Sequence, residues 1–224
     1  MINSALLLAA SLPSTLLNGL VGYWKLDGDG NDVLGVSNGT VQGSGSSWST
    51  GKIGSAFYSG GAARVNVGGA AQIKPTAAIS LGGWFWFNTT TPNARHCSDW
   101  HQDGAKDRWI FPYSVGSTQV FCHMGVNLLV GTFGVNLTAN TWHHLVATCN
   151  VNAMTSYCDG ALVSTATGSS LFHSGAGNVC IGQQEETGGG HDGRIDEFGM
   201  WNRAITAGEV TEWYNAGAGK THPF

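Results

Sequence analysis

Short runs of alternating hydrophobic and polar residues follow one another along the chain, separated by turns rich in glycine, asparagine and aspartate. The alternation is clearest at 195–202, where it suits a strand with two different faces. The Gly- and Ser-rich segment 43–51 is expected to be a loop. Such closely spaced short strands predict an all-β sandwich. The predicted strands are 19–26, 55–58, 63–67, 79–88, 109–113, 118–123, 128–133, 142–149, 155–158, 161–165, 178–182 and 195–202.

The last predicted strand is followed by a signal for one short helix. Thr206 can cap the helix, and Glu209 stands three residues further on, which is the spacing of a capping box. Val210, Trp213 and Tyr214 would then form its apolar side. The sequence therefore predicts a brief C-terminal helix that closes the domain.

Composition indicates one folded domain and argues against nucleic acid as a partner. Glycine accounts for 34 of 224 residues, charged residues make up 11%, and nine Trp and nine Phe supply bulk for a core. The length fits a single sandwich domain, expected at 19–224, with no second domain. The net charge is −4, and ten Lys and Arg are spread thinly, so the chain offers no basic stripe for a phosphate backbone.

The five cysteines match neither a metal-binding motif nor a dense disulfide scaffold. They stand at positions 97, 122, 149, 158 and 180. Cys149 and Cys158 flank the turn at 150–156, where a bridge is sterically conceivable. The favoured interpretation is that these are small buried thiols on strands.

Several short segments, which recur in order over 19–217, resemble the laminin-G-like, concanavalin A-like lectin/glucanase superfamily. They are Gly-Leu-Val-Gly-Tyr-Trp-Lys-Leu-Asp-Gly at 19–28, Asn-Gly-Thr at 38–40, Gly-Lys-Ile-Gly-Ser-Ala-Phe at 51–57, Ile-Ser-Leu-Gly-Gly-Trp-Phe-Trp at 79–86, Trp-His-His-Leu-Val-Ala-Thr at 142–148, Tyr-Cys-Asp-Gly at 157–160 and Arg-Ile-Asp-Glu at 194–197. The resemblance implies a jelly-roll β-sandwich of two antiparallel sheets, one of them concave. It says little about activity, because this fold carries lectins, hydrolases and structural modules.

The loop after the first strand is a candidate calcium site. Asp27, Asp29, Asn31 and Asp32 crowd oxygen donors into a Gly-rich loop, as a hard cation requires. The resemblance implies that a structural calcium would tie this loop to Asp196 of the final strand, with backbone carbonyls near residues 59 and 60. The alternative is an ordinary turn in which Asp and Asn side chains cap their own backbone while Asp196 bonds a neighbouring loop.

Catalysis is not predicted. Glu185 and Glu186 are adjacent, as are Asp196 and Glu197, and neighbouring residues of a regular strand point to opposite faces. The sequence predicts no strand-to-helix turn of the kind that forms a Gly-x-Ser-x-Gly nucleophile elbow. The histidines lack the HxH or HxxxH spacing of a zinc site, and the adjacent His143 and His144 cannot both face one ion. We therefore expect a protein that is not an enzyme.

Carbohydrate binding is the better functional prediction, because the segment 96–113 mixes flat apolar faces with planar hydrogen-bonding groups. The loop 183–192 would form the opposite rim. In the alternative interpretation, Trp100 and Trp109 fill the core, where Trp84, Trp86, Trp142 and Trp201 are also expected. The predicted ligand-binding residues are Trp100, His101, Asp103, Arg108, Trp109, Gln183, Glu185 and His191.

The first 18 residues are predicted to form an apolar arm that docks onto a partner, since an apolar terminal segment is ordered when it packs on something. The arm is too short and too interrupted to span a bilayer. Its predicted partner-binding residues are Leu6, Leu7, Leu8, Leu12, Leu16 and Leu17.

The sequence is compatible with two functions. In the first, the chain is a non-enzymatic surface-display protein, anchored through the arm to a larger assembly such as a phage capsid or tail, which could also bind host-surface glycans. In the second, it is a secreted lectin-like module whose N-terminus is removed. The Met start and the apolar arm favour the first. A closed homo-oligomer would suit surface display.

Overall fold

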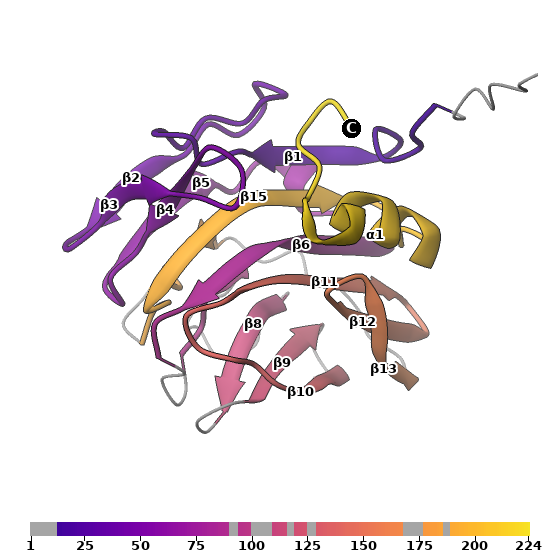
Figure 1. The fold of residues 1–224 in the computed structure, drawn as a ribbon. Coiled ribbons are helices and arrows are strands. Elements are labelled where there is room, and N and C mark those ends of the chain that lie inside the picture. The colour runs from indigo at the N-terminus through magenta and orange to yellow at the C-terminus, as the bar shows by residue number, and fades with distance from the viewer. Residues whose placement is uncertain are drawn as a thin grey trace, which may run out of the picture.

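Two antiparallel sheets form the molecule, drawn in Figure 1 from a computed structural model. The structure describes residues 13–89, 94–99, 109–115, 119–124, 129–167, 177–185 and 189–224. The strands are β1 (Leu20–Trp24), β2 (Thr40–Gly43), β3 (Ser47–Thr50), β4 (Ser55–Tyr58), β5 (Ala63–Gly68), β6 (Ala78–Phe87), β7 (Cys97–Asp99), β8 (Trp109–Val115), β9 (Gln119–Met124), β10 (Leu129–Asn136), β11 (Trp142–Asn150), β12 (Ala153–Cys158), β13 (Ala161–Thr167), β14 (Val179–Ile181) and β15 (Gly193–Trp201). One α-helix, α1 (Ala207–Tyr214), follows them, and short 3-10 turns lie at Ala71–Ile73 and Asn215–Gly217.

Within the described ranges, sheet A has eight strands and sheet B has seven. Sheet A runs in the order β13-β12-β11-β6-β15-β4-β3, with β1 paired to the far end of β15. Sheet B runs β10-β9-β8-β7-β14-β5-β2. The described strand pairs of both sheets are antiparallel, which confirms the predicted all-β sandwich of two antiparallel sheets. Three strands were not predicted: β2, β7 and β3, the last of which lies in the segment expected to be a loop.

The main core lies between the sheets and follows the alternation of each strand. In β5 the residues Ala63, Val65 and Val67 are buried and alternate with half-buried ones. They pack with inward-facing residues of sheet A such as Phe85 and Leu145. Period-two alternation in the sequence therefore selects the buried face of each strand.

A second apolar cluster covers the other face of sheet A, where α1 packs (Figure 1). Its members are Leu16, Tyr23, Val146, Tyr157, Trp201, Ile205, Val210 and Trp213. On β11, Val146 belongs to this outer cluster, whereas its neighbours Leu145 and Ala147 belong to the main core. Adjacent strand residues point to opposite faces, so α1 lies on the side of sheet A that faces away from sheet B.

The C-terminal helix is capped as the sequence predicts. The Thr206 side chain accepts a hydrogen bond from the Glu209 backbone N–H, and the Glu209 carboxylate accepts one from the Thr206 N–H. The Glu209 carboxylate also accepts hydrogen bonds from the Arg203 guanidinium and from the Thr15 hydroxyl. The helix ends at Asn215, whose φ of 49° is left-handed.

Only the last part of the predicted arm falls within the described residues. Leu16 is fully buried in the outer cluster, and its carbonyl accepts a 2.6 Å hydrogen bond from Trp201 Nε1. Leu17 is 48% exposed. Leu16 is therefore part of the packing of the domain, while Leu6, Leu7, Leu8 and Leu12 lie outside the described residues. Among the described helices, none has the length and hydropathy needed to cross a bilayer.

The four described cysteine side chains are buried free thiols, as the favoured interpretation expects. They are Cys97, Cys149, Cys158 and Cys180. The conceivable bridge between Cys149 and Cys158 does not form, because Cys149 pairs with Met154 while Cys158 pairs with Leu145. The two thiols thus sit four residues apart along β11, roughly 13 Å.

Candidate functional site

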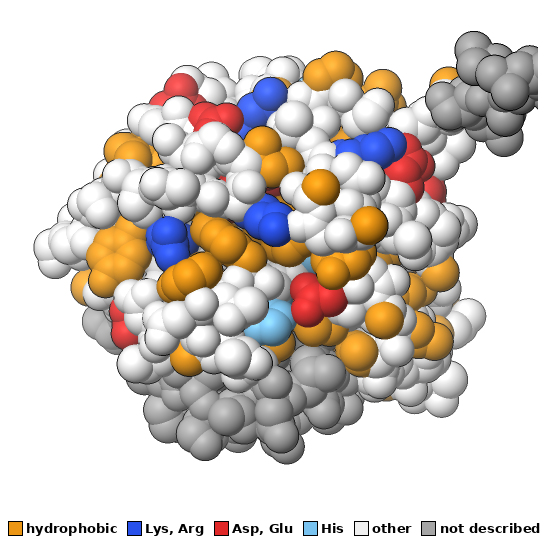
Figure 2. All heavy atoms as spheres, in the orientation of Figure 1, with side chains coloured by type: hydrophobic (Ala, Val, Ile, Leu, Met, Phe, Trp, Pro, Cys, Tyr) orange, Lys and Arg blue, Asp and Glu red, His pale blue; other side chains and the backbone are white. Residues whose placement is uncertain are grey.

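A row of half-buried aromatic and basic side chains crosses four neighbouring strands on the outer face of sheet A. Strand register places Trp142 of β11 opposite Trp86 of β6, Trp86 opposite Arg194 of β15, and Arg194 opposite Tyr58 of β4. Cross-strand partners share a face, so the four side chains form one continuous strip. We call these four residues the aromatic row. Figure 2 shows hydrophobic side chains gathered beside basic ones on this side of the molecule.

The centre of the aromatic row is a cationic group held between two indoles. The Trp86 and Trp142 rings meet edge to face, with centroids 5.8 Å apart. The Arg194 guanidinium carbon lies 4.1 Å from the Trp86 ring centroid and 5.3 Å from that of Trp142, within the range of cation–π attraction. Arg194 Nη1 also donates to the Thr50 carbonyl at 2.8 Å. This one hydrogen bond fixes the orientation of the planar guanidinium group at the surface of the sheet.

A polar rim borders the aromatic row where β6 ends and β15 begins. The Asn88 amide donates to Asp192 Oδ1 at 3.1 Å and contacts the Tyr58 hydroxyl at 3.5 Å. The Thr89 hydroxyl donates to Asp192 Oδ2 at 2.9 Å. The site thus combines flat apolar surfaces with amide, carboxylate and hydroxyl groups.

Along β6, the aromatic row is bordered by Trp84, which is two residues before Trp86 and is 1% exposed. Its ring stacks with Tyr214 at a centroid distance of 5.7 Å, and Lys52 Nζ lies 4.6 Å from its centroid. Trp84 therefore supports the sheet face without being open to a ligand.

The adjacent acids of β15 share the outer face of sheet A, contrary to the expectation from a regular strand. Glu197 has a φ of 51°, and the register with β6 shifts between Asp196 and Gly199. This irregularity is a β-bulge, which adds a residue and turns the Glu197 side chain to the outer cluster. There Glu197 Oε2 accepts a 2.5 Å hydrogen bond from the Tyr23 hydroxyl.

Both acids are fully buried, and burial decides their protonation. Desolvation, together with the charge of Glu197, raises the pKa of Asp196 to about 8. Desolvation also raises the pKa of Glu197 to about 7. The C-terminal segment lies over this region, where the Lys220 carbonyl contacts the Tyr23 hydroxyl at 3.4 Å. The two acids are close together but closed to a substrate.

The predicted calcium residues fall into two separate pairs. Asp27 Oδ1 accepts from Ser55 N at 2.6 Å, and Asp196 Oδ2 accepts from the backbone of residues 52 and 53, so both carboxylates border the loop 51–55. Asp29 instead accepts from the backbone and side chain of Asn31, at 2.9 and 2.8 Å, in the exposed loop. Asp29 and Asn31 thus follow the alternative interpretation, a turn that caps itself.

Asp32 and the carbonyls near residues 59 and 60, which were also expected at the calcium site, do not lie with Asp27 and Asp196. Asp32 accepts four backbone N–H groups, from residues 23, 34, 36 and 37, which use both of its oxygens. Ser59 N bonds to Gly193 O at 3.1 Å. The carbonyls expected near residues 59 and 60 therefore lie three residues from Asp196 along β15, roughly 10 Å away. Asp196 Oδ1 is buried without a hydrogen-bond partner, and this oxygen is the one that fits a cation.

The predicted carbohydrate site is only partly described, and two of its members are buried. Trp109 is 1% exposed and belongs to the main core, as the alternative interpretation proposed. His191 is fully buried, with its Nδ1 atom 2.8 Å from His96 Nδ1. Neither side chain can therefore face a ligand. Trp100, His101, Asp103 and Arg108 lie outside the described residues.

The remaining two predicted residues are half-buried and belong to the loop that follows β14. Glu185 accepts hydrogen bonds from the backbone and the side chain of Asn178, which fixes its carboxylate within the protein. Gln183 also makes contacts within the protein. The aromatic row, by contrast, was missed because Trp86 and Trp142 were expected in the core. The signal that could have identified the row is the Trp-Phe-Trp alternation at 84–86, which gives two indoles to the face opposite Phe85.

The chain belongs to the concanavalin A-like lectin/glucanases superfamily, whose Laminin_G_3 family model matches residues 59–211. The resemblance read from the sequence is thereby confirmed. No curated protein matches the chain.

Solved structures show the same fold at low sequence identity. Domain 4 of AbnA, a GH43 extracellular arabinanase from Geobacillus stearothermophilus, in complex with arabinotriose, is similar with a TM-score of 0.68 and 16% identity, covering 86% of this chain and 97% of that one. The binding domain of Paraclostridial Mosquitocidal Protein 1 has a TM-score of 0.67 and 16% identity, covering 89% and 52%. The binding domain of botulinum neurotoxin DC, in complex with rat synaptotagmin II, has a TM-score of 0.64 and 13% identity, covering 88% and 51%. The chain thus spans about half the length of these two toxin domains.

Proposed function

We propose that the domain binds carbohydrate on the outer face of sheet A, along the aromatic row. The observation that carries this proposal is the register that aligns Trp142, Trp86, Arg194 and Tyr58 across four strands. Regular strands hold the four side chains in fixed relative positions, so the surface is formed before a ligand arrives.

The chemistry of the row suits a sugar ring. The C–H faces of a pyranose or furanose pack on indole rings, while its hydroxyl or carboxylate oxygens accept hydrogen bonds from a guanidinium. The rim residues Asn88, Thr89 and Asp192 add donors and acceptors beside the row. The similarity to a domain solved with arabinotriose supports this class of ligand.

The proposed binding is not followed by catalysis. The acids that lie closest together on this sheet, Asp196 and Glu197, have no exposed surface. A glycosidase needs two carboxyl groups that flank the bond being cleaved, and neither of these can reach a sugar at the row. This argument supports a binding module over an enzyme.

An extracellular surface is the proposed location, in keeping with the extracellular arabinanase to which the domain is similar. The comparisons give no support to the narrower prediction of a phage virion. The choice between a displayed domain and a secreted lectin depends on the N-terminal arm.

The proposal is tested by a glycan array followed by titration calorimetry with the best ligand, at fixed ionic strength. We expect the wild-type chain to bind, and Trp142→Ala to weaken binding about tenfold, because an aromatic contact contributes ~0.5–1.5 kcal/mol and 1.4 kcal/mol is tenfold in affinity. Arg194→Gln is expected to weaken it at least as much, since it removes the cation and the oriented donors.

The matched control is Leu162→Ala on β13, which removes an exposed apolar side chain, 61% exposed, away from the row. Its affinity should equal that of the wild type. If no glycan binds, or if binding survives both Trp142→Ala and Arg194→Gln, the aromatic row is not the site. Release of reducing ends from the bound glycan would contradict the non-enzymatic proposal.

A further inference from the structure

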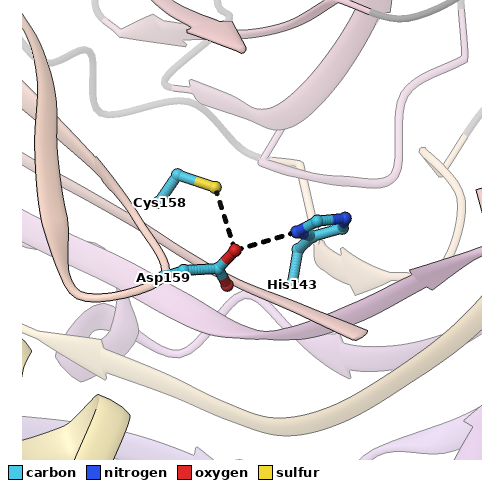
Figure 3. Close-up of side chains that lie close together, drawn as sticks. All are labelled: His143, Cys158 and Asp159. Atoms are coloured by element: carbon cyan, nitrogen blue, oxygen red, sulfur yellow. Dashed lines mark hydrogen bonds and ion pairs between the residues drawn. The ribbon is translucent and has the colours of Figure 1, made fainter. Parts of the chain in front are cut away.

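Three potential metal ligands of different chemical type meet at one end of sheet A (Figure 3). They are His143 of β11, Cys158 at the end of β12 and Asp159 in the turn after it, and one ligand atom from each lies within 4.8 Å of the others. His143 Nδ1 is 3.0 Å from Asp159 Oδ2, and Cys158 Sγ is 3.7 Å from the same oxygen. Among the described residues, this is the one such group of three His, Cys or acidic side chains.

The hairpin between β12 and β13 builds this cluster. Its two-residue turn is Asp159-Gly160, with φ values of 50° and 77°, the left-handed pair that a tight hairpin requires. Cys158 pairs with Leu145 in the neighbouring strand, so the turn lies beside the start of β11, where His143 stands. Strand pairing thus brings the three residues together in space.

Both the histidine and the carboxylate are held by a partner outside the cluster. His143 Nε2 lies 3.3 Å from the Thr138 carbonyl, and Asp159 Oδ1 accepts the His144 backbone N–H at 2.8 Å. Metal-binding histidines usually donate their second ring nitrogen to such a carbonyl, and metal-binding carboxylates are usually hydrogen-bonded as well. These contacts point the ligand atoms inward.

The contact between His143 Nδ1 and Asp159 Oδ2 needs a proton or a cation between the two atoms. A neutral His143 that donates from Nε2 to Thr138 has a lone pair on Nδ1, and this lone pair faces the Asp159 carboxylate oxygen. Two acceptors 3.0 Å apart repel each other unless a proton or a metal cation joins them. The Cys158 thiol points to that same oxygen.

We propose that His143 Nδ1, Cys158 Sγ and Asp159 Oδ2 bind one Zn²⁺ ion. Tetrahedral zinc with bonds of ~2.0–2.3 Å separates its ligand atoms by about 3.3–3.7 Å. The observed separations are 3.0 Å between Nδ1 and Oδ2 and 3.7 Å between Sγ and Oδ2, and the third pair lies within 4.8 Å, so the three atoms must shift to reach one ion. Imidazole, thiolate and carboxylate together suit Zn²⁺ far better than Ca²⁺ or Mg²⁺, which prefer oxygen. On binding, the Sγ–Zn bond forms and the thiol proton leaves to solvent.

Three protein ligands leave a fourth position for water or for a donor from another molecule. Access to that position is available on the carboxylate side, where the Asp159 side chain is 37% exposed, whereas the His143 ring is 11% exposed. A Cys-His nucleophile is not the better explanation, because the thiol contacts the carboxylate and no contact joins it to the imidazole. The zinc site is independent of the proposed carbohydrate site.

The test uses the full chain freed of metal with a chelator and titrated with Co²⁺. One equivalent should produce the thiolate-to-cobalt charge-transfer band and the strong visible bands of tetrahedral cobalt, and Zn²⁺ should abolish both. Cys158→Ser should lose the charge-transfer band. His143→Gln and Asp159→Asn should weaken Zn²⁺ binding by about 100-fold or more, since removal of even an outer partner costs 10–100-fold.

Cys180→Ala is the matched control, because it removes a buried thiol of sheet B and should leave the cobalt spectrum unchanged. A measurement on the unmodified chain avoids any folding defect of the variants: Zn²⁺ should protect the peptide that contains Cys158 from alkylation and add one ion to the native mass. The absence of a thiolate band at one equivalent, or its persistence in Cys158→Ser, would overturn the proposal and leave a His143–Asp159 ion pair.

Discussion

The His96–His191 pair is a polar contact in the middle of an apolar core. Its Nδ1 atoms are 2.8 Å apart, and the edges of both rings meet the Phe87 ring. His191 Nε2 donates to the Arg194 carbonyl at 3.1 Å, so His191 Nδ1 is an acceptor and His96 Nδ1 is its donor. This arrangement requires the His191 ring to be neutral.

The pair should make the domain sensitive to acid. Burial lowers the pKa of His191 from 6.5 to about 4, and it also lowers that of His96, where the His191 charge contributes. The unfolded chain binds a proton near pH 6.5 and the folded chain binds it only near pH 4, so the contribution of His191 to stability is constant above pH 6.5 and falls as the pH drops from 6.5 to 4. His191 alone should contribute about 3 kcal/mol to this loss. Urea unfolding at pH 7 and pH 4.5 measures it.

The control is His191→Gln, whose amide can accept from His96 and donate to the Arg194 carbonyl but cannot be protonated. We expect the variant to lose less stability on acidification than the wild type. Because the raised pKa values of Asp196 and Glu197 act in the opposite direction, the difference between the two proteins is the quantity to compare. Identical pH profiles would show that the pair does not titrate on unfolding.

Local hydrogen bonding fixes α1 on the outer face of sheet A. Thr206 and Glu209 complete the capping box, and Val210 and Trp213 bury the helix against the outer cluster. At eight residues, α1 is too short to be stable alone, so its cap and its packing must act together.

Removal of the cap should destabilise the domain measurably. Thr206→Ala leaves the Glu209 backbone N–H without its acceptor, which typically costs ~1 kcal/mol and lowers the Tm of a chain of this size by about 2–4 °C. Thr211→Ala on the exposed side of the same helix is the control and should leave the Tm nearly unchanged. If the two substitutions lower the Tm equally, the cap does not contribute more to stability than an exposed threonine of the same helix. Differential scanning calorimetry distinguishes these outcomes.

The loop 51–55 joins two carboxylates that a cation could bridge, and we propose that calcium binds between Asp27 and Asp196. Millimolar Ca²⁺ should raise the Tm of the wild type and of Asp29→Asn, because Asp29 belongs to a separate turn. Asp196→Asn should lose the response. Without calcium this variant should be close in stability to the wild type, because the raised pKa of Asp196 leaves its buried carboxyl largely protonated at neutral pH and an amide has the same size. Scanning fluorimetry with Ca²⁺, Mg²⁺ or chelator gives the comparison, and a Ca²⁺ response retained by Asp196→Asn would exclude the site.

The sequence predicted the strands with strong alternation and the capped helix, because period two and the Thr206–Glu209 spacing are local signals. It could not place Glu197, since a bulge depends on how β15 pairs with its neighbours. It also could not decide which face of β6 is covered. Phe85 faces sheet B, while α1 and the C-terminal segment cover Trp84 and leave Trp86 half-exposed. The cluster of His143, Cys158 and Asp159 likewise depends on a tertiary contact between strands.

The beginning and the end of the described chain meet on the outer face of sheet A. Thr15 donates to Glu209, its carbonyl accepts from Arg203, and the Asn18 carbonyl also accepts from Arg203. Leu16 and Phe224 both pack with Trp201 and Trp213 in the outer cluster. Residues 14–18 therefore connect the N-terminal segment to the helix and to the last strand.

This connection changes what a truncation of the predicted arm would test. Deletion of residues 1–13 keeps these contacts. Deletion of residues 1–18 removes Leu16, whose carbonyl accepts from Trp201 Nε1, and the two backbone carbonyls that accept from Arg203. Loss of a buried leucine alone costs ~2–5 kcal/mol, so the longer deletion should lower the free energy of unfolding by at least that amount relative to the shorter one. Urea unfolding of both truncated proteins measures the difference.

A loss of assembly caused by the longer deletion would thus be ambiguous, because it would combine docking with stability. The shorter deletion is the proper test of display, since it removes Leu6, Leu7, Leu8 and Leu12 and spares Leu16. Failure of the 1–13 deletion to join a particle, with glycan binding intact, would support an arm that docks the domain. Normal particle incorporation would assign the apolar N-terminus another role. Equal stability of the two truncated chains would instead show that residues 14–18 contribute nothing to the fold.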